Sequence, residues 1–276
     1  IMGMKTITSV VLLCMTVFTA FAQAPKTFKS IEDALRKPEV VKILDLRGQG
    51  LKAIPDELAL CTNLEKIDLT GNELSEFPAV LSKFKKLKIL FLTNNQLRSL
   101  GNINTMTTLL NLKTDNNPFL KPNEELKKVT TLINLVVLGF SANKASVFPL
   151  ELLSLTKLAE LDLSYNAIRT IPEGIDKIAG LKKINLAKNF LSAFPKSFSK
   201  LKKLENMDIS YNEFKVLQDD LSGLTALEVL DCSFNKLLTT MPSLVALKFF
   251  NVKNTKLNVK LLQEKGTIPL SCSVLM

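Results

Sequence analysis

Apolar and polar residues follow one pattern that recurs along most of this chain of 276 residues. The pattern is L-x-x-L-x-L-x-x-N-x-L, and successive copies mostly begin 23 residues apart. Ten copies can be aligned, beginning at Val41, Leu64, Leu87, Leu109, Leu135, Leu158, Leu181, Leu204, Leu227 and Leu247. No single helical face collects these leucines, because their spacing does not keep the 3.6-residue period of a helix. Such self-similarity predicts a stack of repeated structural units.

Each copy predicts one short β-strand followed by a return segment. Apolar residues at positions 4 and 6, such as Leu161 and Leu163, alternate with positions 3, 5 and 7, which is the period of a strand. Proline after the strand, as at Pro172, stops strand pairing and begins the return. A single copy cannot bury its apolar face, so the copies must stack with positions 4 and 6 inside.

Position 9 of the pattern is asparagine in eight of the ten copies. The chain turns out of the strand here, so backbone N–H and C=O groups are buried between copies and need partners. The asparagine amide donates and accepts hydrogen bonds at once. We therefore predict a structural ladder that links neighbouring copies and consists of Asn72, Asn95, Asn117, Asn143, Asn166, Asn189, Asn212 and Asn235.

This pattern resembles that of the leucine-rich-repeat family. The Ile-Pro and Phe-Pro pairs after several strands make the copies similar to the 23-residue repeats that occur in exported bacterial members. The resemblance implies an α/β leucine-rich-repeat solenoid, a right-handed superhelix shaped like a horseshoe. Its concave side would be a parallel β-sheet, and its convex side would consist of irregular, 3-10 and short helical segments.

The pattern divides the chain into four segments. We predict a signal peptide over residues 1–24, an N-terminal capping helix over 25–40, about ten leucine-rich repeats over 41–262, and a C-terminal tail or cap over 263–276. Ser30 followed by Asp33 is typical of a capped helix start. A second short helix is expected in the long fourth copy, over 121–129, where acidic residues precede lysines.

The first 24 residues predict export. Lys5 precedes an almost uncharged apolar run over residues 7–21, and small residues in A-x-A order follow at Ala20–Ala22 and Ala22–Ala24. A membrane anchor is the alternative, but the run is shorter than the roughly 20 apolar residues that span a bilayer. We therefore expect a secreted, periplasmic or cell-surface protein with no transmembrane span after cleavage.

Composition argues against an enzyme. The chain has no histidine, the commonest general base and metal ligand, and it contains no phosphate-binding loop or metal-ligand cluster. We predict no catalytic residues, no metal and no cofactor. Three cysteines follow the signal segment, an odd and widely spaced set that does not make a disulfide framework. Cys272 is the one candidate for a reactive thiol, and we disfavour that role.

Function should lie in the variable positions, which point outward or line the edges of the concave sheet. The only two tyrosines of the chain both occupy position 8, where Phe234 continues their row, and aspartates recur at position 5. Exposed aromatics beside hydrogen-bonding acids are typical of recognition surfaces. The predicted ligand contacts are Tyr165, Tyr211, Phe234, Asp162, Asp208, Asp231, Asn185 and Lys188.

Each set of these residues also has a structural interpretation. Aspartate at position 5 is usual in the family, and the tyrosines could simply pack along the strand edge. A second, weaker candidate patch comprises Phe91, Val136, Val137 and Gly139.

The formal charge of +10 raises the question of an anionic partner. Lysine pairs occur at Lys85–Lys86, Lys127–Lys128, Lys182–Lys183 and Lys202–Lys203, and we favour a solvated face over a binding patch. No nucleic-acid motif accompanies them. We expect a monomeric module that binds a protein partner and no specific nucleic acid. The alternative is a binder of glycans or of cell-envelope polymers that uses the same aromatics and flanking lysines.

Overall fold

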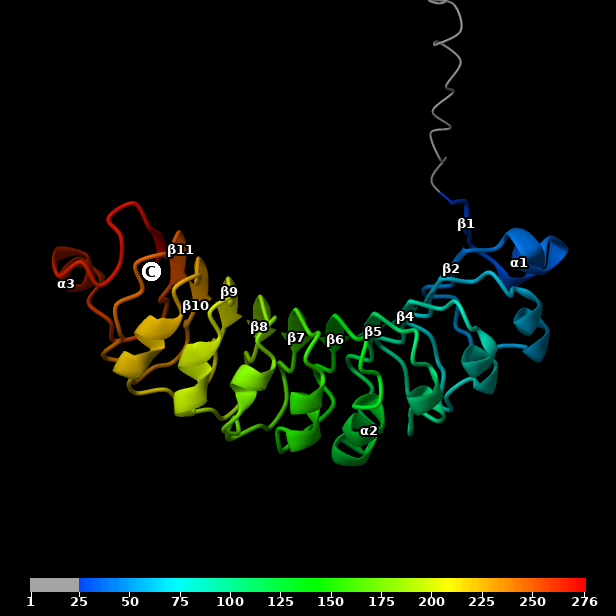
Figure 1. The fold of residues 1–276 in the computed structure, drawn as a ribbon, viewed down its shortest axis with the longest axis horizontal. Coiled ribbons are helices and arrows are strands. Elements are labelled where there is room, and N and C mark those ends of the chain that lie inside the picture. The colour runs from blue at the N-terminus through cyan, green and yellow to red at the C-terminus, as the bar shows by residue number, and fades with distance from the viewer. Residues whose placement is uncertain (1–24) are drawn as a thin grey trace, which may run out of the picture.

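The computed structural model describes residues 25–276, and the signal peptide predicted for residues 1–24 lies outside the described residues. The described chain forms a curved solenoid, in which each copy of the pattern makes one coil. Strands line the inner, concave side and helical turns line the outer, convex side (Figure 1). The predicted solenoid with a parallel concave sheet is confirmed.

Each of the ten coils supplies one three-residue strand from positions 3 to 5. Neighbouring strands pair in parallel and in register, so Leu161 lies between Leu138 and Ile184, which hold the same position in the adjacent coils. One twelve-stranded sheet results, in chain order from β1 to β12. The strands of the ten coils are β2 (Ile43–Asp45), β3 (Lys66–Asp68), β4 (Ile89–Phe91), β5 (Asn111–Lys113), β6 (Val137–Gly139), β7 (Glu160–Asp162), β8 (Lys183–Asn185), β9 (Asn206–Asp208), β10 (Val229–Asp231) and β11 (Phe249–Asn251).

Apolar side chains at positions 4 and 6 fill the interior of the solenoid. Leu163 and Leu186, both at position 6, have no exposed surface, and Leu161 at position 4 is 2% exposed. Burial of a leucine side chain contributes about 1.5–3 kcal/mol relative to exposure. One continuous core therefore runs through all ten coils and holds neighbouring coils together.

The convex side carries the return segments, most of which form one short 3-10 helix. Proline stands directly before four of them, at Pro55, Pro78, Pro149 and Pro195, where its fixed φ favours the turn out of extended backbone. These elements are η1 (Pro38–Val40), η2 (Asp56–Leu60), η3 (Ala79–Lys83), η4 (Ile103–Thr105), η5 (Leu150–Ser154), η6 (Ile175–Lys177), η7 (Lys196–Lys200) and η8 (Asp219–Gly223).

Three coils depart from this arrangement. The ninth, whose residues are all described, has no helix in its return segment, the tenth has α3 (Val259–Glu264), and the fourth has the α-helix α2 (Pro122–Val129). This helix corresponds to the one expected over residues 121–129. Glu125 on α2 is buried, and its carboxylate accepts a hydrogen bond from the Leu100 backbone amide at 2.7 Å and pairs with Lys128 at 3.0 Å. The extra residues of this coil thus replace a 3-10 turn with a helix anchored to the preceding coil.

Both ends of the sheet are covered by added strands. At the N-terminal end, β1 (Thr27–Phe28) pairs with β2, and α1 (Ile31–Arg36) follows, with the Ser30 hydroxyl accepting from the Asp33 amide at 3.1 Å. At the other end, α3 (Val259–Glu264) leads to β12 (Ser273–Leu275), which pairs with β11. The sequence pattern indicated the first helix and neither added strand.

Cys272 lies in the C-terminal cap and is buried. Burial raises the pKa of its thiol, which disfavours the reactive thiolate. This placement agrees with the sequence-based view that disfavoured a reactive thiol at Cys272. Cys61 and Cys232 are also free and buried in the core. Within residues 25–276, no helix combines the length and hydropathy needed to cross a bilayer.

Candidate functional site

The ladder asparagines lie between neighbouring coils, at the end of each strand. The Asn189 amide nitrogen donates to the carbonyls of Leu186 in its own coil and Leu163 in the preceding coil, both at 3.0 Å. Its oxygen accepts from the Ile168 amide at 2.9 Å. Each of the other seven also donates to a carbonyl and accepts from an amide of the preceding coil. These side chains serve the scaffold and leave no free groups for a ligand.

The aspartates at position 5 cap the ends of their strands. The Oδ1 atoms of Asp162 and Asp231 accept hydrogen bonds from the backbone amide and the hydroxyl of the serine two residues on, Ser164 and Ser233. The Oδ2 atoms of the same two aspartates accept from asparagines of the next coil, at 3.1 and 2.7 Å. Both carboxylates are therefore engaged in structural bonds.

Asp208 differs from these two aspartates. Its Oδ1 accepts from the Ser210 amide at 2.9 Å, whereas its Oδ2 accepts no hydrogen bond from the described residues. Of the three aspartates predicted as ligand contacts, only Asp208 offers a free carboxylate oxygen to the concave face.

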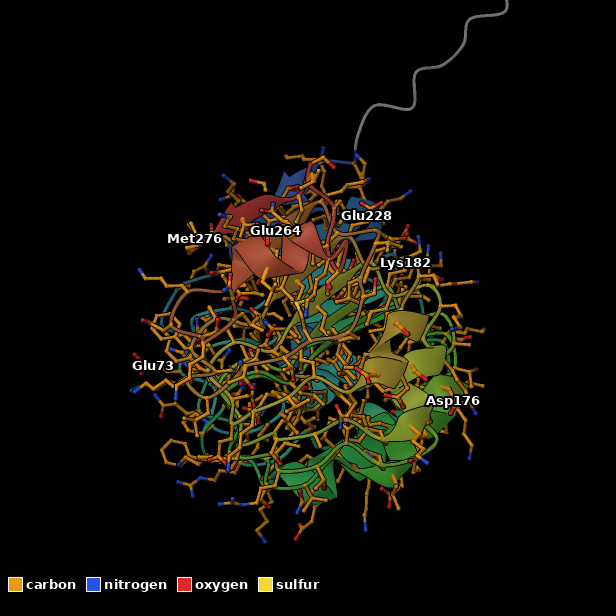
Figure 2. The ribbon with its side chains drawn as sticks, turned by 90° about the vertical axis from the view of Figure 1, so that its left-hand side faces the viewer. Glu73, Asp176, Lys182, Glu228, Glu264 and Met276 are labelled. Carbon is orange, nitrogen blue, oxygen red and sulfur yellow. The ribbon has the colours of Figure 1, made fainter. Side chains whose placement is uncertain are left out.

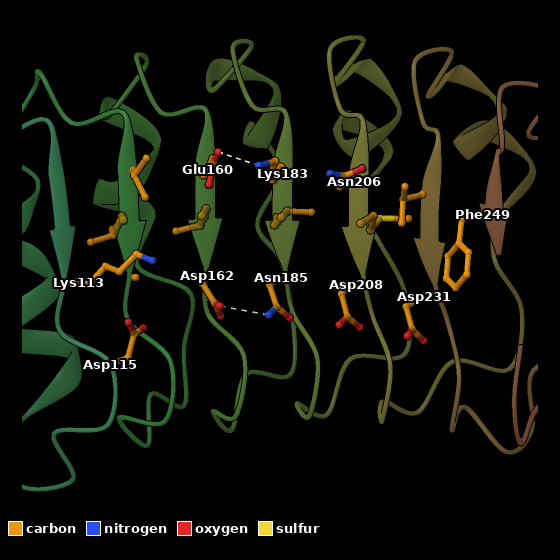
Figure 3. Close-up of a pocket in the computed structure, with 17 residues that line it drawn as sticks. Lys113, Asp115, Glu160, Asp162, Lys183, Asn185, Asn206, Asp208, Asp231 and Phe249 are labelled. Atoms are coloured by element: carbon orange, nitrogen blue, oxygen red, sulfur yellow. Dashed lines mark hydrogen bonds and ion pairs between the residues drawn. The ribbon is translucent and has the colours of Figure 1, made fainter. Parts of the chain in front are cut away.

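A hollow of about 470 Å³ runs across the concave face from β5 to β11 (Figure 3). Asp162, Asn185, Asp208 and Asp231 line it, as do Val137 and Gly139 of the weaker predicted patch. Position 3 adds Glu160, Lys183, Asn206 and Phe249, which the sequence did not single out although that position always faces outward. Acidic groups dominate the lining: Asp115, Glu160, Asp162, Asp208 and Asp231 face two lysines, Lys113 and Lys183. We call this surface the concave hollow.

Two carboxyl groups of the concave hollow have perturbed pKa values. Burial raises the pKa of Asp208, and the nearby Asp231 and Asp162 raise it further, against the lowering effect of the bond from Ser210. Burial likewise raises the pKa of Asp115, with a smaller contribution from Asp162. Both groups would gain from a cation or hydrogen-bond donor brought into the hollow.

Asp115 comes from position 7 of its coil and takes the place of a missing aspartate. The next coil has Gly139 at position 5, where other coils have aspartate, and the Ser141 amide donates instead to Asp115 at 2.8 Å. A Cβ atom on Gly139 would lie 2.7 Å from Asp115 Oδ2. The glycine thus makes room for the carboxylate of the preceding coil. The sequence signal for this exchange was a glycine at position 5 together with an aspartate at position 7 of the preceding coil.

Position 8 follows the strand and adopts the left-handed backbone conformation in all ten coils. Four of the first five coils have Gly48, Gly71, Asn94 and Asn116 there, residue types that tolerate it. Coils six to nine have instead Tyr165, Lys188, Tyr211 and Phe234, with φ between 54° and 58°. Each such residue in a disfavoured region costs roughly 1–3 kcal/mol. We call these four residues, which are three aromatic residues and one lysine, the aromatic row.

The aromatic row is packed against itself. The Lys188 ammonium lies 4.2 Å from the ring centroid of Tyr165 and 4.9 Å from that of Tyr211. Tyr211 in turn stacks on Phe234, with centroids 4.0 Å apart and an interplanar angle of 7°. Tyr165 and Tyr211 nevertheless remain 55% and 43% exposed.

The structure separates the eight predicted ligand contacts into two groups. Asp162, Asn185, Asp208 and Asp231 line the concave hollow, and none of the aromatic row does. Tyr211 and Phe234 instead line two hollows on the edge where the strands end. The aromatic row therefore lies at the edge of the concave sheet, because the left-handed turn carries it past the ends of the strands. Figure 2 shows the two edges, with Lys182 and Glu228 before their strands and Glu73 after its strand on the opposite side.

Comparison with known proteins identifies the type of repeat that forms this solenoid. A family model described as leucine rich repeat matches residues 39–97 and 179–237, which include coils one, two, seven and eight in full. The chain is a leucine-rich-repeat protein. No curated protein sequence matches it significantly.

Solved leucine-rich-repeat structures share its fold. One from Leptospira interrogans is 20% identical, with a TM-score of 0.53 over 91% of this chain and 100% of that chain. An internalin C2 from Listeria monocytogenes is 18% identical, with a TM-score of 0.62 over 72% of this chain and 84% of its own. The ectodomain of a plant membrane receptor kinase from Arabidopsis thaliana, in complex with Casparian Strip Integrity Factor 2, is 24% identical, with a TM-score of 0.59 over 84% of this chain and 32% of that chain. At these identities the likeness shows the fold alone.

The lysine pairs of this leucine-rich-repeat protein are mostly engaged within the chain. Lys182 and Lys183 each pair with a glutamate of a neighbouring coil at 3.0 Å, Glu205 and Glu160. Of the other lysines in these pairs, Lys85, Lys86, Lys127, Lys128 and Lys202 also contact an oxygen acceptor. Exposed pairs contribute about 0–1 kcal/mol each. These contacts favour the solvated-face interpretation over an anion-binding patch.

Replacement of Gly139 by alanine should lower the free energy of unfolding by about 1–3 kcal/mol, because the added methyl group displaces Asp115 from its bond to Ser141. Urea unfolding measures this loss. The double variant Asp115→Ser with Gly139→Asp restores the Asp-x-Ser order of coils six, eight and nine. It should be less destabilised than Gly139→Ala, and a neutral Gly139→Ala would contradict the exchange.

Replacement of Asp208 by asparagine should raise the melting temperature at pH 7. The pKa of Asp208 is raised in the folded protein, so ionisation costs stability once the pH exceeds its unfolded value. The advantage of the variant should shrink as pH falls through the folded pKa and vanish below the unfolded one. Asparagine fits this position, since Asn185 Oδ1 accepts the equivalent bond from Ala187. A gain independent of pH, measured by thermal unfolding, would contradict this cause.

Proposed function

We propose that this protein is a non-catalytic interaction module that binds a protein partner through the concave hollow. Leucine-rich-repeat domains are typically protein–protein interaction modules and are generally not catalytic. One observation carries the assignment to this surface. Asp208 Oδ2 and the Asn206 side chain on β9 make no hydrogen bond with the described residues, and Phe249, which lines the same hollow from β11, is 38% exposed. The fold does not use these groups, whereas a partner can.

The acidity of the hollow indicates the chemistry that the partner must bring. The unpaired carboxylate oxygen of Asp208 favours donors, so we expect lysine, arginine or amide groups of the partner to approach Asp208. Phe249 and Val229 supply the apolar contact at the C-terminal side of the hollow. The complex of the plant receptor ectodomain named above supports the view that such solenoids bind another molecule.

The proposal includes export and a monomeric state. Export is proposed because residues 1–24 resemble a signal peptide, in which Lys5 precedes an apolar run and an A-x-A site. N-terminal sequencing of protein produced in a bacterial host tests export, since cleavage should leave a chain that begins after Ala22 or Ala24. An uncleaved N-terminus would contradict it, and light scattering tests the monomer.

The partner surface can be tested with two triple variants. The first, Lys183→Ala, Asn206→Ala and Phe249→Ala, removes one charged, one amide and one aromatic side chain from the concave hollow. The matched control, Lys177→Ala, Lys196→Ala and Asp220→Ala, changes exposed residues of η6, η7 and η8 on the convex side. We expect a protein captured from extracts by the unchanged chain and by the control to be lost with the first variant. Equal capture by all three would contradict the proposal.

A different outcome would favour the glycan or envelope-polymer alternative. That alternative predicts retention of an anionic polysaccharide without a captured protein, and retention should fall steeply with ionic strength.

A further inference from the structure

The edge where the strands end changes character along the solenoid. We define the loop edge as positions 8 to 12 of coils five to ten, which are residues 142–146, 165–169, 188–192, 211–215, 234–238 and 254–258. Its basic residues are Lys144, Arg169, Lys188, Lys215, Lys236 and Lys256, and Glu213 is its only acidic residue. In the first four coils the same positions hold two basic residues and one acid, with Lys52 paired to Glu73.

The cations of the loop edge lack acidic partners. Among residues 25–276, none of the six forms an ion pair within 4 Å, and all are exposed. At the opposite edge, which precedes the strands, Lys88, Lys182 and Lys248 pair with Glu65, Glu205 and Glu228 at 2.7–3.0 Å. Glutamates thus compensate several lysines of that edge, whereas the six cations of the loop edge have no acidic partner among the described residues.

The aromatic row lies within this basic surface. Tyr211 is contacted by the Phe234 ring and by Lys188, and Tyr165 is contacted by Lys188, while both tyrosines stay exposed in part. Ring edges are the positive part of the aromatic quadrupole, and phenolic hydroxyls donate hydrogen bonds. The row therefore favours an anion that approaches edge-on. Its central ring, Tyr211, is occupied by Phe234 and Lys188 and is not free for stacking on a sugar or a base.

The loop edge also has an apolar recess. A hollow of about 650 Å³ is lined by Tyr211, Phe234 and Leu237, and two basic residues, Lys215 and Lys236, and one acidic residue, Glu213, lie at the same site. Leu237 is 51% exposed, and Phe190 nearby along this edge is 41% exposed with Arg169 over its ring at 4.9 Å. A ligand that fills this recess must carry an apolar group as well as negative charge.

We infer that the loop edge binds an acidic protein segment that carries apolar side chains among its carboxylates. Charge complementarity selects the acidic residues, and the recess beside Leu237 selects the apolar ones. Polyanions such as nucleic acids or acidic glycans satisfy only the first requirement. This surface is distinct from the concave hollow, which is acidic, so the inference does not depend on the function proposed for that hollow.

The backbone supplies a variant that separates binding from folding. Asparagine occupies position 8 in three other coils, where Asn94, Asn116 and Asn254 have φ of 55°, 52° and 56°. The triple variant Tyr165→Asn, Lys188→Asn and Tyr211→Asn therefore places a tolerated residue in each left-handed turn. It should unfold at a temperature no lower than that of the unchanged protein. Lys200→Asn, on the convex side, is the control that removes the same net charge.

Fluorescence anisotropy with a labelled short peptide of glutamates interspersed with leucines tests the inference. The unchanged chain, the Lys200→Asn control and the concave-hollow triple variant should bind this peptide alike. The asparagine triple variant should bind it about ten-fold more weakly or worse. A peptide with serine for leucine should bind more weakly. A peptide with lysine for glutamate should not bind at the loop edge, so any affinity it has for the acidic concave hollow should be the same in the asparagine triple variant.

Three results would overturn the inference. The first is no binding of the glutamate–leucine peptide, and the second is equal binding by the asparagine triple variant. The third is equal affinity for the serine peptide, an oligothymidylate and heparin of matched charge, which would show a surface for polyanions in general. The concave-hollow variant tests partner capture and changes no residue of the loop edge, so a failure of one proposal can be told from a failure of the other.

Discussion

Replacement of Asn189 by alanine should lower the free energy of unfolding by roughly 3–5 kcal/mol. The side chain is 4% exposed and joins two coils through bonds to Leu163, Leu186 and Ile168. Alanine leaves two carbonyls and one amide without these partners, and each buried group left unsatisfied costs about 1–3 kcal/mol. The loss exceeds that of an ordinary hydrogen-bond deletion because both coils are affected.

Urea unfolding followed by circular dichroism measures this effect. Asn206→Ala is the matched control, because Asn206 is half-buried on β9 and its side chain makes no hydrogen bond with the described residues. The control should change stability by less than about 0.5 kcal/mol. A loss for Asn189→Ala no larger than for the control would show that the ladder does not stabilise the stack.

Replacement of Leu186 by alanine should destabilise the middle of the array by about 2–5 kcal/mol. Leu186 holds position 6 of the seventh coil, has no exposed surface and belongs to the continuous core with Leu163 and Ile209. The truncation opens a cavity between coils that contact only their neighbours, so unfolding should begin there.

Hydrogen exchange locates the opening, and urea unfolding gives its size. Exchange should accelerate first in coils six to eight of Leu186→Ala. Leu150→Ala is the control, since Leu150 on η5 is 63% exposed and its truncation should be almost neutral. A neutral Leu186→Ala would mean that the register assigned to the repeats is in error.

Much of the fold could be predicted because each coil repeats the same physical problem. Positions 4 and 6 had to be apolar for the coils to stack, and ten repetitions of that requirement made the strands visible in the sequence. The short helix over α2 was visible through the order of its charges.

The end strands could not be predicted, because they do not repeat. β1 has two residues, and its pairing with β2 requires only backbone groups, which leave no side-chain signature. β12 pairs with β11 in the same way, after a segment without the repeat pattern. The exchange between Asp115 and Gly139 also escaped, because it involves two different positions in adjacent coils.

The residues of the candidate site could be named from the sequence, but their division between two surfaces could not. Asp208 and its neighbours lie in the concave hollow, whereas the aromatic row lies past the end of the sheet. Gly48 and Gly71 at position 8, followed by Asn94 and Asn116, were the signal for a left-handed turn there. A tyrosine at such a position leaves the plane of the strands and therefore lies on the edge of the sheet.

Photo-crosslinking tests the central claim, that the concave hollow holds the partner. A benzophenone-bearing residue in place of Asn206 lies in the hollow on β9, and the same residue in place of Lys200 lies on the convex side in η7. We predict that the captured protein crosslinks from position 206 and not from position 200. Crosslinking from position 200 with none from position 206 would contradict the account.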